Sequence, residues 1–297
     1  MKFPSIAKES GPIEIGGKTF KNHVSMRTTA IDLLEYYSQK RGNGFLNMPH
    51  NQKEYVRIES DGDRSKFCGG TFAEITKPKT DFATYNKFQN ELKSLSAWQT
   101  LQTTFAQKNK RKRVMNEYDG EWDYDRRFEI KPFSRRGLMP NVHKKVILNV
   151  GFSFHCGISA STINEYGAFS AAIASTLESN GIGVELNIFD ASIDLIHQTR
   201  DLAITWLKIK RFDEYLPSQM ILQLFNANFF RRVLFGCKIK SSDDLNKPVH
   251  WGLGEPFQSK THWECMPGTI YLHSCKLLDR QNDCITDILK SINGGAI

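Results

Sequence analysis

A short apolar run, a stretch of small residues and a long helical pattern succeed one another in the middle of the chain. Val146–Val150 is a compact apolar run, as expected of a strand buried on both faces of a sheet. Residues 151–159 are rich in small side chains and predict a loop. Ser161–Ser179 carries apolar residues at helical spacing, and the Asn180–Gly181 pair ends it.

Further strands and helices are predicted to alternate toward the end of the chain. We expect strands at Gly183–Phe189, Ala203–Lys210, Val233–Lys238 and Thr269–His273, and helices at Pro217–Phe230 and Asp283–Ile292. Strands that alternate with helices imply crossover connections and a largely parallel sheet. This half is therefore predicted to be an α/β unit whose mostly parallel sheet is flanked by helices.

The first part of the chain mixes helical and extended patterns. A helix is expected at Thr28–Lys40, capped by one of the two threonines at its start. From Asp81 to Lys108 apolar residues recur every three or four positions, which predicts a long helix with a core-facing stripe. Weaker patterns suggest strands at Lys53–Ser60 and Cys68–Thr76, and a loose arm at residues 1–17.

The pattern of apolar and polar residues changes at Pro140 and Asn141, and this change divides the chain into two regions. Residues 1–140 form an N-terminal α+β region that contains the long helix and a basic segment, and residues 141–297 form the α/β domain. Domain sizes leave two alternatives open for the first region. It is either a separate domain or a part that completes the covering of the sheet.

The composition is that of a globular chain with a basic excess. Its 297 residues are 40% hydrophobic and carry a formal net charge of +8, with a pI near 9.1. No apolar run approaches the roughly 20 residues that span a bilayer, and the N-terminus lacks the apolar stretch of a secretory signal. Six scattered cysteines then fit free thiols in a reducing, cytoplasmic compartment. The basic excess favours encounter with polyanions.

Cationic residues concentrate between Lys108 and Arg136, interleaved with aromatic residues. They are Lys108, Lys110, Arg111, Lys112, Arg113, Arg126, Arg127, Arg135 and Arg136. The run at residues 108–113 is either a solvated helix end or a contact for phosphate or RNA. The aromatic residues Trp122, Tyr124, Phe128 and Phe133 lie among the later arginines, a pattern typical of binding surfaces and also of a strand pair that covers a core.

Weaker chemical candidates occur at three other places. His155 and Cys156 lie in the loop after the first buried strand, where a thiol beside a helix N-terminus can act as a nucleophile. His262, Cys265, His273 and Cys275 offer soft ligands for zinc at unusual intervals. Asp123, Asp125 and Glu129 could hold a metal, although neighbouring arginines are the better partners for them. No catalytic residue and no cofactor follow from these patterns.

The order of strand, small-residue loop, helix and Gly-led strand over residues 146–190 resembles the opening of a von Willebrand factor A (vWA) domain, a Rossmann-like fold. In that family the loop carries Asp-x-Ser-x-Ser and holds a divalent cation through oxygen ligands. Asn149, Gly151 and Ser153 stand at the matching positions, so only one of the three ligands is retained. The resemblance therefore implies a vWA-like domain with a degenerate metal site.

A wider similarity concerns the segment before this opening. The basic run, the Asp123–Arg127 stretch and the degenerate loop together are similar to uncharacterised proteins encoded by bacteriophages. This resemblance implies no activity, and it implies the cytoplasm of a host cell as the compartment.

Two hypotheses of function follow. The first is a non-enzymatic binding or scaffold protein of a phage or mobile element, with another protein as its partner. The second is a protein that binds single-stranded nucleic acid through the basic segment 108–136.

Overall fold

The computed structural model describes part of the chain, and the account below concerns that part alone. The described residues are 7–15, 18–33, 68–71, 73–75, 82–94, 99, 112–116, 121–122, 133–137, 145–155, 157–180, 182–193, 202–212, 214, 216, 218–237, 255–256 and 269–272. Two of the expected elements lie outside them, namely the strand at Lys53–Ser60 and the helix at Asp283–Ile292. Residues 34–40 of the helix expected at Thr28–Lys40, and residues 95–98 and 100–108 of the helix expected at Asp81–Lys108, lie outside them as well.

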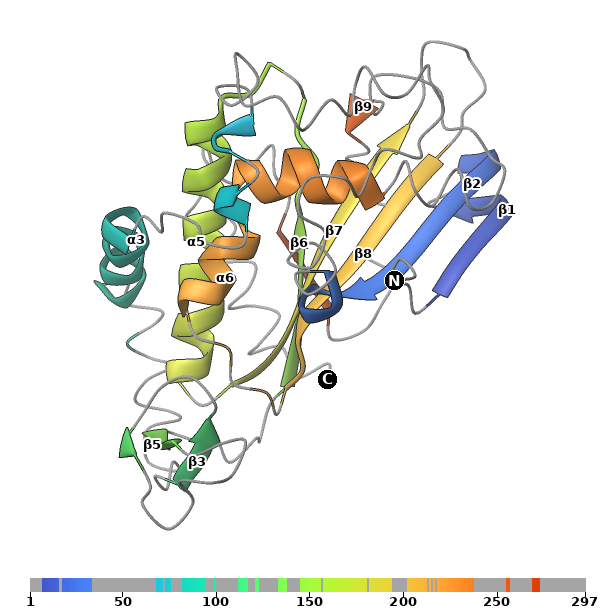
Figure 1. Ribbon diagram of the computed structural model, residues 1–297. Helices are drawn as coiled ribbons and strands as arrows, with labels where there is room; N and C mark the ends of the chain where they lie inside the picture. Colours follow the sequence, from blue (N-terminus) through green and yellow to red (C-terminus); the bar gives the residue numbers. More distant parts are fainter. Residues whose placement is uncertain are drawn as a thin grey trace.

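A large mixed sheet forms the centre of the fold (Figure 1). Within the described residues its strands are β1 (Ala7–Ile15), β2 (Lys18–Thr29), β6 (Lys145–Gly151), β7 (Gly183–Ile193), β8 (Leu202–Lys210), β9 (Glu255–Pro256) and β10 (Thr269–Leu272). The order is β1-β2-β8-β7-β6-β10, and β9 pairs with β7. The ladders β10/β6, β6/β7 and β2/β8 are parallel, whereas β7/β8, β1/β2 and β7/β9 are antiparallel.

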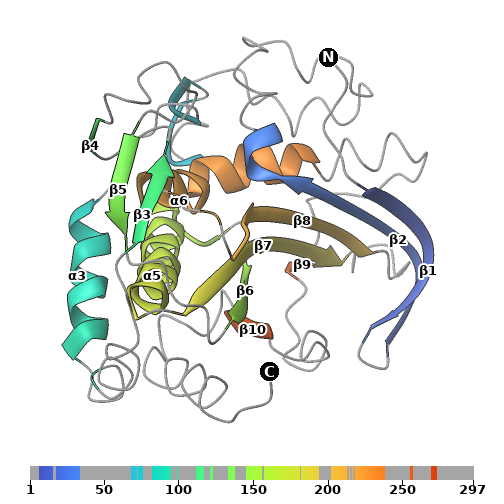
Figure 2. The same ribbon diagram turned by 90° about the horizontal axis from the view of Figure 1, so that it is seen from below.

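Helices pack against one side of this sheet (Figure 2). On that side lie a 3-10 helix (Ala73–Ile75), α5 (Ala160–Ser179), α6 (Ser218–Leu224) and a π-helical segment (Phe229–Leu234), and α3 (Phe82–Ser94) packs on α5. The central helix is α5, which contacts α3, α6 and β7. The prediction of an α/β sheet flanked by helices is therefore confirmed, but β8 returns antiparallel to β7 and makes the sheet mixed rather than largely parallel.

A second, smaller sheet lies apart from the large one, on the side of the molecule where α3 and α5 lie (Figures 1 and 2). Its strands are β3 (Lys112–Asn116), β4 (Glu121–Trp122) and β5 (Phe133–Gly137), in the order β3-β5-β4, and both ladders are antiparallel.

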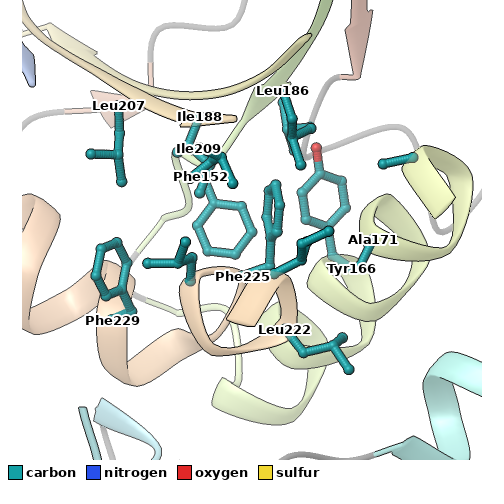
Figure 3. Packing of buried hydrophobic residues seen from close by; sticks show 14 of the residues in the cluster. Phe152, Tyr166, Ala171, Leu186, Ile188, Leu207, Ile209, Leu222, Phe225 and Phe229 are labelled. Carbon is teal, nitrogen blue, oxygen red and sulfur yellow. The ribbon is translucent and has the colours of Figure 1, made fainter. Parts of the chain in front are cut away.

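Phe152 lies at the centre of the hydrophobic core between the large sheet and its helices (Figure 3). Its ring centroid is between 5.2 and 5.7 Å from those of Phe154, Tyr166, Phe225 and Phe230. Most of these rings meet edge to face, the arrangement that aromatic quadrupoles favour. Since each large buried apolar side chain contributes about 1.5–3 kcal/mol, this cluster is a principal source of stability.

The N-terminal elements complete the same sheet and core. β2 pairs with β8, and α3 places its buried stripe of Tyr85, Phe88 and Leu92 toward the core shared with α5. Of the described elements before residue 140, β1 and β2 extend the large sheet and α3 packs on α5, whereas β3, β4 and β5 form the small sheet. The division of the chain at residue 140 stays a prediction.

The first strand corrects the expectation of a loose arm over residues 1–17. Ala7–Ile15 pairs with β2, and the register of the pair shifts at Pro12, between Gly11 and Ile13. Proline cannot donate to a ladder and is tolerated at such irregularities and on edge strands. The next helix begins at Ala30, two residues later than predicted, and Thr29 Oγ1 accepts from the Asp32 amide over 3.2 Å as its cap.

Two predicted strands are wrong. Residues 73–75 of the segment Cys68–Thr76 form a 3-10 helix, and Val233–Cys237 of the segment Val233–Lys238 is helical. The second error has a simple cause, since a short apolar run with a β-branched residue has no periodicity that separates a strand from a buried helix.

Close helix packing depends on Gly167 in the middle of α5. A Cβ atom at this position would lie 1.8 Å from the carbonyl oxygen of Phe225, at the end of α6. Only glycine lets the two backbones approach so closely.

Among the described residues no helix is long and apolar enough to cross a membrane.

Candidate functional site

The loop at the carboxyl end of β6 is joined to β7 through the side chain of Ser153. The backbone ladder continues to the Phe152 amide, which donates to the Phe189 carbonyl over 2.8 Å. One residue later, Ser153 Oγ accepts from the Ala191 amide over 2.7 Å and donates to Asp190 Oδ1 over 2.9 Å. The hydroxyl thus continues the ladder where the β6 backbone leaves the sheet.

Asn149 and Gly151, the other two positions that the sequence resemblance to vWA loops singles out, also use their polar atoms inside the fold. Asn149 is 4% exposed, and its Oδ1 accepts from Asn187 Nδ2 over 3.0 Å across the parallel ladder. The Gly151 carbonyl accepts from the Tyr166 hydroxyl over 2.9 Å, which fixes α5 to the end of β6. Asn149, Gly151 and Ser153 therefore form a hydrogen-bonded seam between β6, β7 and α5.

Asp190 is the carboxylate that this seam brings to Ser153, and sequence reasoning did not single it out. It is 1% exposed and lies opposite Thr205 in the β7/β8 ladder. Its signal in the sequence is an aspartate directly after the apolar strand pattern Gly183–Phe189. Within the described residues there is no group of three or more His, Cys, Asp or Glu side chains that could hold a metal ion.

The remaining loop residues form a turn that leads into α5. His155 is exposed, and its Nδ1 accepts from the Gly157 amide over 3.1 Å. Ser159 caps the helix by accepting from the Thr162 amide over 3.1 Å. The side chain of Arg231 donates to the Ile158 carbonyl and so ties the turn to the π-helical segment. Cys156 lies outside the described residues.

The small sheet brings together four of the nine cationic positions predicted to bind nucleic acid. Arg113 and Arg136 are Cα partners in the antiparallel β3/β5 ladder. Lys112 lies opposite Gly137, and Arg135 lies opposite Val114, on the two neighbouring rungs. The other five positions, Lys108, Lys110, Arg111, Arg126 and Arg127, lie outside the described residues. So do the zinc candidates His262, Cys265, His273 and Cys275, and the acidic candidates Asp123, Asp125 and Glu129.

A buried ion pair lies at the opposite end of β7 from Asp190. The register shifts in the β7/β8 ladder between Leu186 and Asn187, and Lys210 comes to lie opposite Leu186, whose side chain belongs to the helix-covered core. Lys210 is 1% exposed, and its Nζ donates to Glu178 Oε1 and, over 3.0 Å, to the Val184 carbonyl. Burial raises the pKa of Glu178, and Lys210 partly offsets this rise.

The comparison with protein families gives one match. A family model described as a domain of unknown function, DUF7192, matches residues 19–296. The chain belongs to the DUF7192 family. No match was found among curated proteins or among solved structures. The DUF7192 match begins within β2 and continues past β10, so it spans both predicted regions and agrees with their shared sheet. Its description names no activity.

Proposed function

We propose that this chain is a non-enzymatic nucleic-acid-binding protein in which the large sheet is a scaffold and the β3/β5 strands carry the contact. One observation carries the proposal, namely the register that makes Arg113 and Arg136 neighbours, with Lys112 and Arg135 on adjacent rungs. Cationic side chains are almost never fully buried unless they are paired. Because strand residues alternate between the two sides of a sheet, Arg113 and Arg136 share one side and Lys112 and Arg135 share the other. The two paired strands therefore place cations, which bind phosphates, on both sides of the small sheet.

The charge of the whole chain supports the same ligand. A net charge of +8 attracts a polyanion over distances longer than single contacts and raises the rate of encounter. The sequence alone placed a protein partner first and nucleic acid second. The register of the basic strands supports placing nucleic acid first, because it brings four of the predicted cationic positions onto two paired strands.

The scaffold in this proposal is a vWA-like unit whose loop binds no metal ion. The support is the order of β6, a small-residue loop, α5 and the Gly-led strand β7. Ser153 and Asn149, which stand at ligand positions of the vWA loop, engage Asp190, Ala191 and Asn187 instead. The origin of the chain in a phage stays a prediction.

The proposal is tested by fluorescence anisotropy of labelled oligonucleotides with the full chain and two charge-matched variants. In the first variant Lys112, Arg113, Arg135 and Arg136 are replaced by serine. In the control variant serine replaces four exposed cations of other elements, namely Lys21, Lys87, Lys93 and Arg211. We expect the first variant to lose at least about tenfold in affinity and the control to lose much less.

A third variant separates charge from folding. Replacement of Arg113, Arg135 and Arg136 by lysine keeps every positive charge of the small sheet and is expected to keep the affinity, because phosphate binding depends chiefly on charge. Equal losses in the two serine variants would contradict the assigned site, since affinity would then follow net charge alone. Absence of binding by the wild type at low salt would contradict the proposal itself.

A further inference from the structure

Pairing of β4 with β5 in the small sheet brings two aromatic residues together near the basic positions. Trp122 of β4 and Phe133 of β5 are Cα partners. Phe133 is also the partner of Asn116 on the other side, so one row of the sheet reads Asn116, Phe133, Trp122. Directly opposite positions of antiparallel strands are the nearest neighbours that a sheet offers, with Cβ atoms about 4.5–5.5 Å apart.

The aromatic row lies a short distance from the cationic rows along the same strand. Arg135 and Arg136 follow Phe133 by two and three residues, which corresponds to about 7 and 10 Å at the rise of an antiparallel strand. Phe133 and Arg135 have the same parity in β5, so they belong to the same side of the sheet, as does Lys112, the partner of Gly137. Arg136 and its partner Arg113 belong to the other side. One short oligonucleotide can therefore reach an aromatic position and a cationic position together.

We infer that the small sheet binds single-stranded nucleic acid on one side, with bases stacked at Trp122 and Phe133 and phosphates at Arg135 and Lys112. The inference rests on the proposed function and narrows its substrate class. In a duplex the base faces are covered by neighbouring bases, whereas a single strand offers them to aromatic side chains. Charge alone works in the opposite direction, because a duplex has the higher charge density and releases more counterions for each contact.

Three probes of equal length separate stacking from charge, namely an oligothymidylate, an abasic oligomer with the same phosphates, and a duplex. The wild type is expected to bind the oligothymidylate at least about fivefold more tightly than the abasic oligomer, the equivalent of one stacked base. It is also expected to bind the oligothymidylate more tightly than the duplex at physiological salt.

Variants then assign this preference to the two aromatic positions. Trp122→Leu with Phe133→Leu keeps apolar side chains and is expected to remove the preference for bases while leaving salt-dependent binding of the abasic oligomer. Trp122→Phe with Phe133→Tyr keeps the rings and is expected to keep the preference. Far-UV circular dichroism and the thermal midpoint of both variants report whether the fold is retained.

The outcomes distinguish this inference from the function on which it rests. Equal affinity of the wild type for the three probes would overturn the inference and leave nucleic-acid binding in place. A leucine variant that keeps the full preference for bases would also overturn it, because the rings would then serve the core. Absence of binding to any probe would overturn both.

Discussion

The Ser153 hydroxyl donates to Asp190 Oδ1 over 2.9 Å, across a sequence separation of 37 residues. The same oxygen accepts from the Ala191 amide, so one side chain connects the loop after β6 to both backbone and side chain of β7. Ser153 is 4% exposed and Asp190 is 1% exposed, which makes the contact part of the protein interior. Ser153, which the vWA resemblance assigns to metal binding, thus serves to hold the loop after β6 against β7.

Replacement of Ser153 by alanine tests this task. The variant leaves the buried Ala191 amide and one oxygen of Asp190 without the hydroxyl, and we expect a loss of about 2–3 kcal/mol in the free energy of unfolding. The exposed hydroxyl of Ser161 at the start of α5 provides the control, since Ser161→Ala is expected to change stability by less than about 0.5 kcal/mol. Urea denaturation of the three proteins measures both values.

A magnesium titration of the same proteins tests the degenerate metal loop. We expect Mg²⁺ and a chelator to leave the Tm of the wild type unchanged, because Ser153 and Asn149 already use their oxygen atoms inside the fold. A rise in Tm with Mg²⁺ that disappears in Ser153→Ala would show a working metal site and contradict this account.

The close approach at Gly167 gives a second stability prediction. Gly167→Ala places a methyl group 1.8 Å from the Phe225 carbonyl oxygen, and neither backbone can move without opening the core. We expect a loss of about 3 kcal/mol or more. Glu165→Ala lies on the exposed side of the same helix and is expected to have little effect. Equal stabilities of the two variants, measured by thermal denaturation, would mean that α5 and α6 pack differently.

The buried pair of Glu178 and Lys210 predicts a dependence of stability on pH. Since burial raises the pKa of Glu178 above its ordinary value of 4.5, the folded state keeps the proton longer than the unfolded state does. The stability contributed by this group is therefore greatest below about pH 4.5 and falls as the pH rises through the raised pKa. Glu178→Gln removes this titration.

Urea denaturation of wild type and Glu178→Gln between pH 4 and 8 measures the effect. The stability of the wild type relative to the variant is expected to decrease as the pH rises. A relative stability of the wild type that increases with pH would mean that Lys210 outweighs the burial of Glu178.

Stepwise deletion tests whether the N-terminal strands belong to the core fold. Removal of residues up to Ile15 takes away only the edge strand β1, and the remaining chain is expected to fold with reduced stability. Removal up to Thr29 also removes β2, which leaves β8 as an unpaired edge and takes the buried Met26 out of the core. Cooperative unfolding is therefore expected to be lost. A cooperative transition in the longer deletion would show that the rest of the chain folds without β1 and β2.

The sequence predicted the elements whose signals are local. The apolar run of β6, the helical spacing of α5 and its end at Asn180 are confirmed, because burial on both faces and helix periodicity leave a direct pattern in the residues. The strand at Ala7–Ile15 was missed, since its Gly11 and Pro12 signal a turn and its pairing depends on β2, which follows it in the chain.

The arrangement of the candidate site depended on contacts that sequence patterns do not contain. Ser153 meets Asp190 only because β6 and β7 are adjacent and parallel. Arg113 and Arg136 are Cα partners only because of the register of β3 and β5, and a shift of one residue would give Arg113 a different partner. The cationic residues themselves were visible in the sequence, whereas their grouping was a result of the fold.

The salt dependence of oligonucleotide binding tests the central claim most directly. The slope of log affinity against log salt concentration counts the phosphates neutralised, at about 0.7 for each contact with a single strand. The account predicts a clear negative slope for the wild type and a slope shallower by about 2–3 when Lys112, Arg113, Arg135 and Arg136 are replaced by serine. A slope that is unchanged in this variant, or equally reduced in the charge-matched control, would contradict binding by the small sheet.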